Sequence, residues 1–186
     1  MARTIKFSKD EILKKSIQFI KEKGYSNLTV RNLAQYIGCS TQPIFKNYEN
    51  FDMYKEDLKQ YLRKDYTTFI HKYIDIKDYL YTISYAYALY AKKEPNIFFS
   101  LFMADLAGSR TVKEVLNTDR NMETINAMVK QYKISLEDAK KIYREVRFYT
   151  HGIATQLCVK SIKLTDKEIK DLIKNNIEIN LRGNKQ

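Results

Sequence analysis

Apolar residues recur at helical spacing through most of the chain, and capping signals divide that pattern into segments. Ser8 and Glu11 have the spacing of a capping box, in which each side chain bonds an amide that the first helical turn leaves unpaired. From Ile12 to Ile20 the apolar side chains share one helical face, and Gly24 follows as a typical helix end. The pattern therefore predicts a first helix between Ser8 and Gly24.

Two shorter helices are predicted next, with a glycine between them. Thr29 is a candidate cap for a helix that reaches about Ile37, and Ser40 is a candidate cap for the following helix. Pro43 falls in the first turn of that helix, where its missing N–H has no intrahelical partner to lose. Gly38 occupies the turn, where a positive φ favours glycine.

These two short helices have the spacing of a helix-turn-helix unit. Ala34 is small enough to let the second helix approach the first closely, and Ile44 is expected to point back into the angle between them. In such a unit the second helix enters the major groove of DNA, and its first residues meet base edges. DNA binding is therefore the leading hypothesis, and the alternative is an αα-corner that only packs.

The helical period continues through the rest of the chain, and no segment has the alternation of a strand. Only 5 Gly and 2 Pro occur among 186 residues, which favours long helices with few breaks. We expect an all-α protein of about nine helices, with a helix-turn-helix head at residues 1–50 and a helical body at residues 51–186. The later helices are expected at about residues 50–73, 77–93, 95–108, 112–132, 135–160 and 165–181.

The chain is basic, with 33 Lys and Arg against 22 Asp and Glu and a net charge of +11. Such a balance favours nucleic acid or an anionic membrane surface as a partner. Part of it reflects composition, since Lys, Ile, Asn and Tyr are all abundant, as AT-rich codons produce. Basic residues nevertheless outnumber acidic ones most strongly in residues 1–48, which agrees with DNA binding by the head.

Several other classes of protein are disfavoured. Cys39 and Cys158 are isolated, which predicts a reduced, cytoplasmic protein without a disulfide framework or a metal site. No signal peptide or membrane span is expected, because charges interrupt every apolar run. His71 and His151 lie far apart and no glycine-rich phosphate loop occurs, so we expect neither an enzyme nor a bound cofactor.

Three consecutive motifs resemble the tetracycline-repressor (TetR) family of bacterial transcriptional regulators. They are ILxxSIxFIxxxGY at residues 12–25, LTVRNLAxxIGCS at residues 28–40 and TQPIFKNY at residues 41–48. The remaining body matches the family only in length and number of helices. The resemblance implies an all-α homodimer with N-terminal DNA-binding heads. It also implies a ligand-binding and dimerisation body whose last two long helices pair with those of a second copy.

The resemblance also implies which residues meet DNA. Thr29 would contact phosphate, while Thr41, Gln42 and Pro43 would start the recognition helix, with Gln42 able to pair with adenine. Lys46 and Asn47 suit contact with the DNA backbone, and Arg3 and Lys6 are candidates for further backbone contacts from an N-terminal arm. The predicted DNA-binding residues are Thr29, Arg31, Ser40, Thr41, Gln42, Pro43, Phe45, Lys46, Asn47 and Lys55.

Two positions depart from the family pattern. Phe45 stands where the family usually has a tyrosine whose hydroxyl contacts phosphate, so that contact is missing. Phe51 stands where the family commonly has a lysine, and Lys55, one turn later, is the candidate substitute.

Family bodies bind a small effector, and the aromatic residues of this body are the candidates to line its pocket. As a group they indicate a large apolar or aromatic effector, with tyrosine hydroxyls as polar fixing points. For each residue alone, ordinary core packing is the alternative. The candidates are Tyr61, Tyr66, Tyr85, Tyr87, Tyr90, Phe98, Phe99, Phe102, Met103 and Asp105.

The last two long helices supply the candidate dimer interface. Gly152 would permit a close helix crossing, and His151 before it completes a His-Gly element found in one branch of the family. We interpret His151 as a hydrogen-bonded core histidine in preference to a ligand or a pH sensor. The predicted interface residues are Gly152, Ile153, Gln156, Ile169, Leu172, Ile173 and Ile177.

The sequence thus predicts a homodimeric repressor that binds a pseudo-palindromic DNA operator and is released by a small apolar or aromatic effector. One alternative is a TetR-like helical protein with altered or lost DNA recognition that acts through protein contacts. Another is a nonspecific basic DNA binder. Activation instead of repression also stays open, because a fold does not set the sign of regulation.

Overall fold

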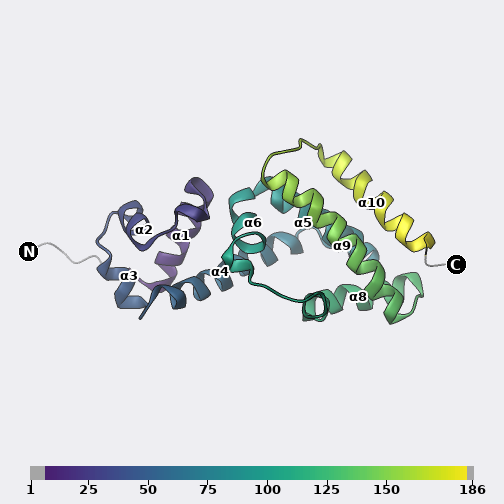
Figure 1. Ribbon diagram of the computed structural model, residues 1–186, viewed down its shortest axis with the longest axis horizontal. Coiled ribbons are helices and arrows are strands. Elements are labelled where there is room, and N and C mark those ends of the chain that lie inside the picture. Colours follow the sequence, from purple (N-terminus) through teal and green to yellow (C-terminus); the bar gives the residue numbers. More distant parts are fainter. Residues whose placement is uncertain (1–6, 184–186) are drawn as a thin grey trace, which may run out of the picture. The chain divides into compact units, whose positions relative to one another are not determined.

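The computed structural model describes residues 7–183, except the side chain of Asp105, and all the regular secondary structure of this part of the chain is helical (Figure 1). Arg3 and Lys6 lie outside the described residues. The predicted all-α class is confirmed. The α-helices are α1 (Lys9–Lys23), α2 (Val30–Ile37), α3 (Gln42–Asn47), α4 (Phe51–His71), α5 (Tyr79–Lys93), α6 (Pro95–Phe102), α7 (Val112–Leu116), α8 (Asp119–Tyr132), α9 (Leu136–Cys158) and α10 (Asp166–Gly183). Three short 3-10 helices connect them: η1 (Tyr25–Asn27), η2 (Ile76–Asp78) and η3 (Asp105–Ala107).

One predicted helix is two helices in the structure. The segment predicted at residues 112–132 is interrupted at Asn117 and Thr118, between α7 and α8. Thr118 is the N-cap of α8 and has extended backbone angles, so the helix cannot run through it. Asn and Thr favour such helix ends because their side chains bond nearby backbone groups.

Most of the predicted caps form. Ser8 and Glu11 make both bonds of the predicted capping box at the start of α1, and Thr29 caps α2 as predicted. Thr165 and Glu168 form another capping box before α10. The predicted Ser40 cap is wrong. Thr41 is the residue before α3, and it has helical backbone angles and makes no side-chain cap bond.

The described chain forms two compact units. The first contains the chain up to Tyr66 together with Glu94–Gly108, and the second contains Thr67–Lys93 and the chain from Ser109 onward. The boundaries fall inside α4 and after α5. These units do not test the predicted division into a DNA-binding head at residues 1–50 and a body at residues 51–186, which stays a prediction.

The first unit is built around α1 and α4. Ile12 and Ile20 of α1 and Leu58 and Leu62 of α4 are fully buried, and α6 packs against α1. Two polar contacts also hold α6 to α1: the Lys21 Nζ lies 3.1 Å from the Glu94 carboxylate, and the Asn96 side chain donates to the Lys21 carbonyl at 2.8 Å.

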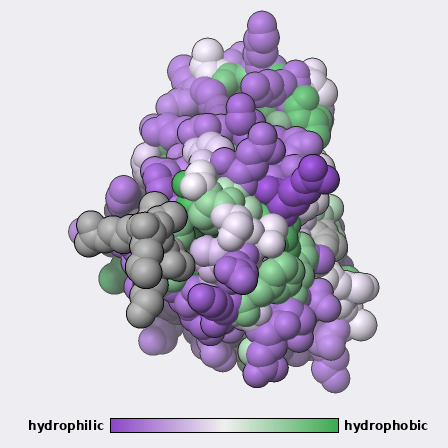
Figure 2. All heavy atoms as spheres, turned by 90° about the vertical axis from the view of Figure 1, so that its left-hand side faces the viewer, coloured by the Kyte–Doolittle hydropathy of each residue, from purple (hydrophilic) through white to green (hydrophobic). Residues whose placement is uncertain are grey.

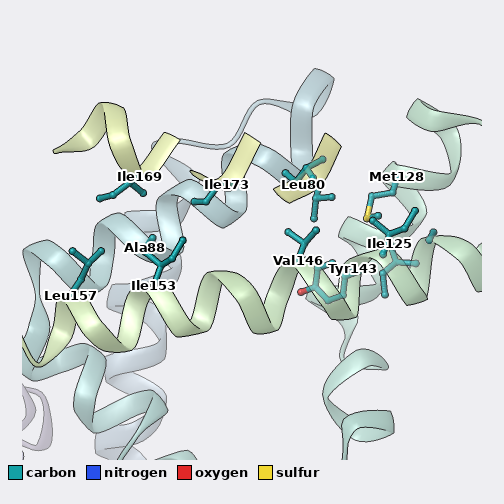
Figure 3. Packing of buried hydrophobic residues seen from close by; sticks show 13 residues of the cluster. Leu80, Ala88, Ile125, Met128, Tyr143, Val146, Ile153, Leu157, Ile169 and Ile173 are labelled. Atoms are coloured by element: carbon teal, nitrogen blue, oxygen red, sulfur yellow. The ribbon is translucent and has the colours of Figure 1, made fainter. Parts of the chain in front are cut away.

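The second unit is built on the pairing of α5 with α9, which α8 and α10 cover. Leu80 and Ala88 of α5 meet Val146 and Ile153 of α9 in one apolar cluster (Figure 3). Figure 3 shows Ile169 and Ile173 of α10 lying over the same cluster. No helix among the described residues is long and apolar enough to cross a membrane.

A buried hydrogen-bond chain ties α1 to α4. The Tyr54 hydroxyl donates to Ser16 Oγ at 2.7 Å, and Ser16 Oγ donates to the Ile12 carbonyl at 2.7 Å. Both side chains are fully buried. Burial raises the pKa of Tyr54, so its hydroxyl keeps the proton that it donates.

Ser16→Ala is expected to lower the free energy of unfolding by roughly 1–3 kcal/mol, because it leaves the buried Tyr54 hydroxyl without its acceptor. Tyr54→Phe removes the hydroxyl itself and should cost less. Urea unfolding followed by circular dichroism measures both, with exposed Ser26→Ala as the control. An unchanged free energy for Ser16→Ala would contradict the role of this bond.

Candidate nucleic-acid interface

The turn between α2 and α3 is set by Gly38. Its φ of 80° and ψ of 35° are left-handed, and its N–H donates to the Ala34 carbonyl at 3.0 Å. Cys39 N–H donates to the same carbonyl at 3.0 Å. A Cβ on Gly38 would meet no atom within 4 Å, so the requirement for glycine comes from the backbone angles. The chain therefore leaves α2 in a fixed direction.

The inner side of the helix-turn-helix is apolar and buried. Leu33 and Ala34 of α2 and Ile44 of α3 are 0%, 3% and 1% exposed. The predicted inward direction of Ile44 is confirmed by this burial. Thr29 begins α2, and its Oγ1 accepts from the Asn32 N–H at 3.1 Å. Burial of Ile44 fixes which side of α3 faces outward.

The outward side of α3 carries Gln42, Phe45 and Lys46, because Phe45 and Lys46 follow Gln42 by three and four residues, about one helical turn. All three are exposed, and the Phe45 side chain is 53% exposed. Figure 2 shows mostly hydrophilic residues, with hydrophobic areas between them, on the side of the molecule that lies to the left in Figure 1. Of the remaining predicted DNA-binding residues, Thr29, Arg31 and Ser40 are exposed, and Thr41, Pro43, Asn47 and Lys55 are partly buried.

Asn47 is engaged within the head. Its Nδ2 donates to the Pro43 carbonyl at 2.8 Å and to the Phe7 carbonyl at 2.9 Å. An amide nitrogen has two hydrogens, and these bonds use both. The remaining Oδ1 is an acceptor and cannot bond a phosphate oxygen. In this geometry Asn47 holds the chain before α1 against the recognition helix.

Phe51 also has a packing role. Its ring stacks on Tyr54 with centroids 5.1 Å apart and an angle of 22°, and Lys55 Nζ lies 5.4 Å from its centroid. The aromatic ring at this position therefore extends the packing at the start of α4. Within the described part of the chain, Arg31 and Lys46 form no ion pair, so their charges face solvent.

The predicted pocket residues lie in both units. In the first unit the Phe102 ring meets Tyr66 at 5.2 Å and Phe98 at 4.9 Å, while the Tyr61 hydroxyl donates to Asp10 at 3.3 Å. Phe99 and Met103 are partly exposed, and the Asp105 side chain lies outside the described part of the structure. Tyr85, Tyr87 and Tyr90 belong to the second unit. A common pocket for these residues stays a prediction.

The three tyrosines of the second unit have different surroundings. Tyr90 is fully buried, and Tyr85 lies under Lys170 Nζ at 5.0 Å. The Tyr87 hydroxyl is 2.9 Å from His151 Nδ1. A groove of about 630 Å³ in this unit contains none of the predicted pocket residues. It is lined by Ile76, Lys77, Tyr79, Glu123, Asn126, Ala127, Lys130 and Gln131. Sequence reasoning missed it because its polar residues look like ordinary helix surface.

The predicted dimer residues divide into two groups. Ile153, Ile169, Ile173 and Ile177 are at most 8% exposed and pack in the protomer's own core, because α10 covers α5 and α9. Leu172 is partly buried, and Gly152 and Gln156 are exposed on α9 and available to a second chain.

The predicted interface residues Gly152 and Gln156 belong to a longer uncharged stripe on α9 whose other members, Phe148 and Val159, were missed from the sequence. Residues 148–159 contain no Asp, Glu, Lys or Arg, and Phe148 and Val159 are 55% and 56% exposed. Phe148, Gly152 and Gln156 recur every four residues, which places them on one face of α9, and Val159 directly follows the end of the helix. The sequence contains the pattern as a second set of uncharged residues at helical spacing, beside the set that is buried.

Asn47→Asp is expected to lower the free energy of unfolding by about 1–3 kcal/mol, because it replaces two donors with a carboxylate that faces two carbonyl oxygens. The control is Asn175→Asp, at an exposed amide of α10. Denaturant unfolding distinguishes the two possible roles. If Asn47 served only as a phosphate contact, the stability of Asn47→Asp would equal that of the wild type.

Stability should also depend on pH through His151. Burial, and secondly the Arg147 guanidinium, lower the pKa of this histidine in the folded protein. Its contribution is therefore fully present above the ordinary histidine value of about 6.5 and is lost as the pH falls through the lowered pKa. Thermal unfolding between about pH 5 and pH 7.5 should show a smaller pH dependence in His151→Gln than in the wild type. The control is His71→Gln, at an exposed histidine. An equal pH dependence of unfolding in His151→Gln and the wild type would contradict the contribution of His151.

No protein-family model matches the sequence, and no curated protein is similar enough to match it. Solved structures do match. A TetR-like transcriptional regulator from Rhodococcus sp. RHA1 superposes with a TM-score of 0.66 at 11% identity, over 97% of this chain and 100% of that chain. A single-residue variant of TetR from Acinetobacter baumannii AYE, in complex with minocycline, gives a TM-score of 0.58 at 15% identity over 96% of each chain. The chain therefore has the fold of TetR-like regulators, as its head motifs predict.

Proposed function

We propose that this protein is a sequence-specific DNA-binding transcriptional regulator, and that it acts as a homodimeric repressor released from its operator by a small effector. The observation that carries the proposal is the outward face of α3. Gly38 and the buried Ile44 fix the orientation of this short helix, so that Gln42 and Lys46 face solvent. A helix held in this way can enter the major groove of DNA.

The contacts divide into those that position the protein and those that select sequence. Arg31 and Lys46 are exposed cations suited to phosphate, and the net charge of +11 favours a polyanionic partner. Thr41, Gln42 and Pro43 begin the recognition helix and would meet base edges. A glutamine amide can pair with N6 and N7 of adenine, which makes Gln42 the main candidate for sequence selection.

A homodimer fits the uncharged stripe on α9. An exposed face that combines Phe148, Gly152 and Val159 without charge resembles the core of an interface more than an ordinary solvated surface. Two recognition helices read successive half-sites when they lie about 34–36 Å, or a multiple of that, apart. The operator would then be pseudo-palindromic.

Release by an effector follows from the same geometry. A ligand that binds better to a dimer with another spacing weakens DNA binding by the ratio of its affinities for the two forms. The aromatic side chains of the body favour an apolar or aromatic effector. Binding of minocycline by the Acinetobacter baumannii neighbour is an example of a small ligand on this fold.

A second candidate function is supported by specific observations. Phe45 lacks the phosphate-binding hydroxyl, Phe51 packs on Tyr54, and both donors of Asn47 are used inside the head. A TetR-like protein with these features could have lost DNA recognition and act through protein contacts. Such a protein would select no sequence from random DNA.

Gln42→Ala tests the proposed function. On a duplex enriched from a random pool by the wild-type protein, the variant should lose roughly 1–3 kcal/mol of binding free energy, because one bidentate base contact is removed. On a scrambled duplex it should lose little. Fluorescence anisotropy at several salt concentrations measures both, with exposed Gln60→Ala as the control. Equal losses on the two duplexes would rule out base reading by Gln42.

A further inference from the structure

Phe45 is an exposed aromatic residue on the working face of the recognition helix. Its side chain is 53% exposed, whereas Ile44 beside it is 1% exposed and fills the core of the helix-turn-helix. Among residues 7–183, no ring or cation contact of Phe45 is recorded, unlike Phe51, which stacks on Tyr54. About half of the Phe45 side chain is therefore open to a partner.

The neighbours of Phe45 indicate what kind of partner the ring meets. Gln42 and Lys46, both exposed, share its helix face. Protein interfaces are depleted in lysine at their centre, while DNA interfaces are strongly basic. An exposed apolar ring beside an amide and an ammonium group therefore matches a partner that carries charge and also offers an apolar group.

The major groove offers one apolar group of this kind. Base edges there present donors and acceptors, except for the C5-methyl group of thymine. A phenyl ring against a donor or acceptor would leave that group without a hydrogen bond, which costs free energy. Against the thymine methyl, the same ring removes apolar surface from water. The chemistry of Phe45 thus selects thymine over the other three bases.

The position of that thymine relative to the base read by Gln42 follows from helix geometry. Side chains three residues apart on a helix have Cβ atoms about 5–6 Å apart, and successive base pairs are about 3.4 Å apart. We propose that Phe45 reads the methyl group of a thymine one or two base pairs from the adenine that Gln42 reads. This inference rests on the proposed function and adds a specificity residue to it.

The test compares thymine with deoxyuridine, which lacks only the methyl group and keeps the same hydrogen-bonding edge. Full-length wild-type protein first selects duplexes from a random pool, and each thymine pair of the symmetric site is then replaced by deoxyuridine. For one such pair of symmetry-related thymines, replacing the thymine of a single half-site should weaken wild-type binding about 4-fold. Replacing the thymines of both half-sites should weaken it about 15-fold, because each replacement removes one buried methyl group. Phe45→Ala should bind the thymine and uracil duplexes equally.

Two further variants make the outcome specific. Phe45→Leu keeps an apolar side chain and should retain part of the discrimination against uracil. Met53→Ala removes an exposed apolar side chain outside the recognition helix, 46% exposed at the start of α4, and should retain all of the discrimination. Circular dichroism and thermal unfolding check that each variant is folded, which the exposure of Phe45 leads us to expect.

The results separate the inference from the proposed function. Two results would overturn the reading of thymine by Phe45 and would leave sequence-specific binding intact. In one, no thymine-to-deoxyuridine replacement in the selected sequence weakens wild-type binding. In the other, Phe45→Ala still distinguishes the two bases. Failure to select any sequence would overturn the proposed function and the inference with it. It would favour a protein partner for the exposed ring.

Discussion

The left-handed backbone at Gly38 is the constraint on which the head depends. It ends α2, in which Leu33 and Ala34 are buried, and sets the direction of the chain into α3, in which Ile44 is buried. Because α3 is a short helix, burial of this one side chain decides which residues face outward. The amide, aromatic and cationic side chains of the opposite face are thereby held ready for a partner before any partner binds. Preorganisation of this kind reduces the entropy lost on binding.

The second unit depends on a different kind of constraint. The helices α5 and α9 bury a common apolar stripe, which α8 and α10 cover, so the inner faces of these helices are used within one chain. The face of α9 that stays exposed is its uncharged outer stripe around Gly152. The buried stripe of α9 thus packs within its own chain, and the outer stripe is the surface that the proposed dimer would use.

The parts of the fold that could be predicted from sequence are those that local chemistry controls. Capping boxes, the glycine turn and the helical period concern residues a few positions apart, and they predicted the all-α class correctly. The failures have the same origin. Neither the break at Asn117 and Thr118 nor the lack of a cap bond at Ser40 changes the apolar period, so periodicity could not reveal them.

The candidate site was harder to predict, because it depends on residues far apart in the sequence. The bond from Asn47 to the Phe7 carbonyl joins positions 40 residues apart, so no local pattern contains it. A buried stripe in α10 looks the same in sequence whether its own chain or a second copy covers it. Ile169, Ile173 and Ile177 were therefore assigned to the dimer interface, although they pack within the protomer.

The exposure of Phe45 is a third example. From the sequence, Phe45 was a predicted DNA-binding residue that lacks the phosphate-contacting hydroxyl of a tyrosine. The structure shows an apolar ring that is more than half exposed, on the same face as Gln42. The residues of the recognition helix could thus be located from sequence, but their division into packing and exposed roles required the fold.

Selection of duplex DNA from a random pool by the purified full-length protein tests the central claim most directly. The account predicts an enriched inverted repeat whose half-site centres lie about one helical turn, or a multiple of it, apart. The enriched duplex should bind far more tightly than a scrambled one of the same composition. Equal affinity for the two duplexes, or the absence of any enriched sequence, would contradict it.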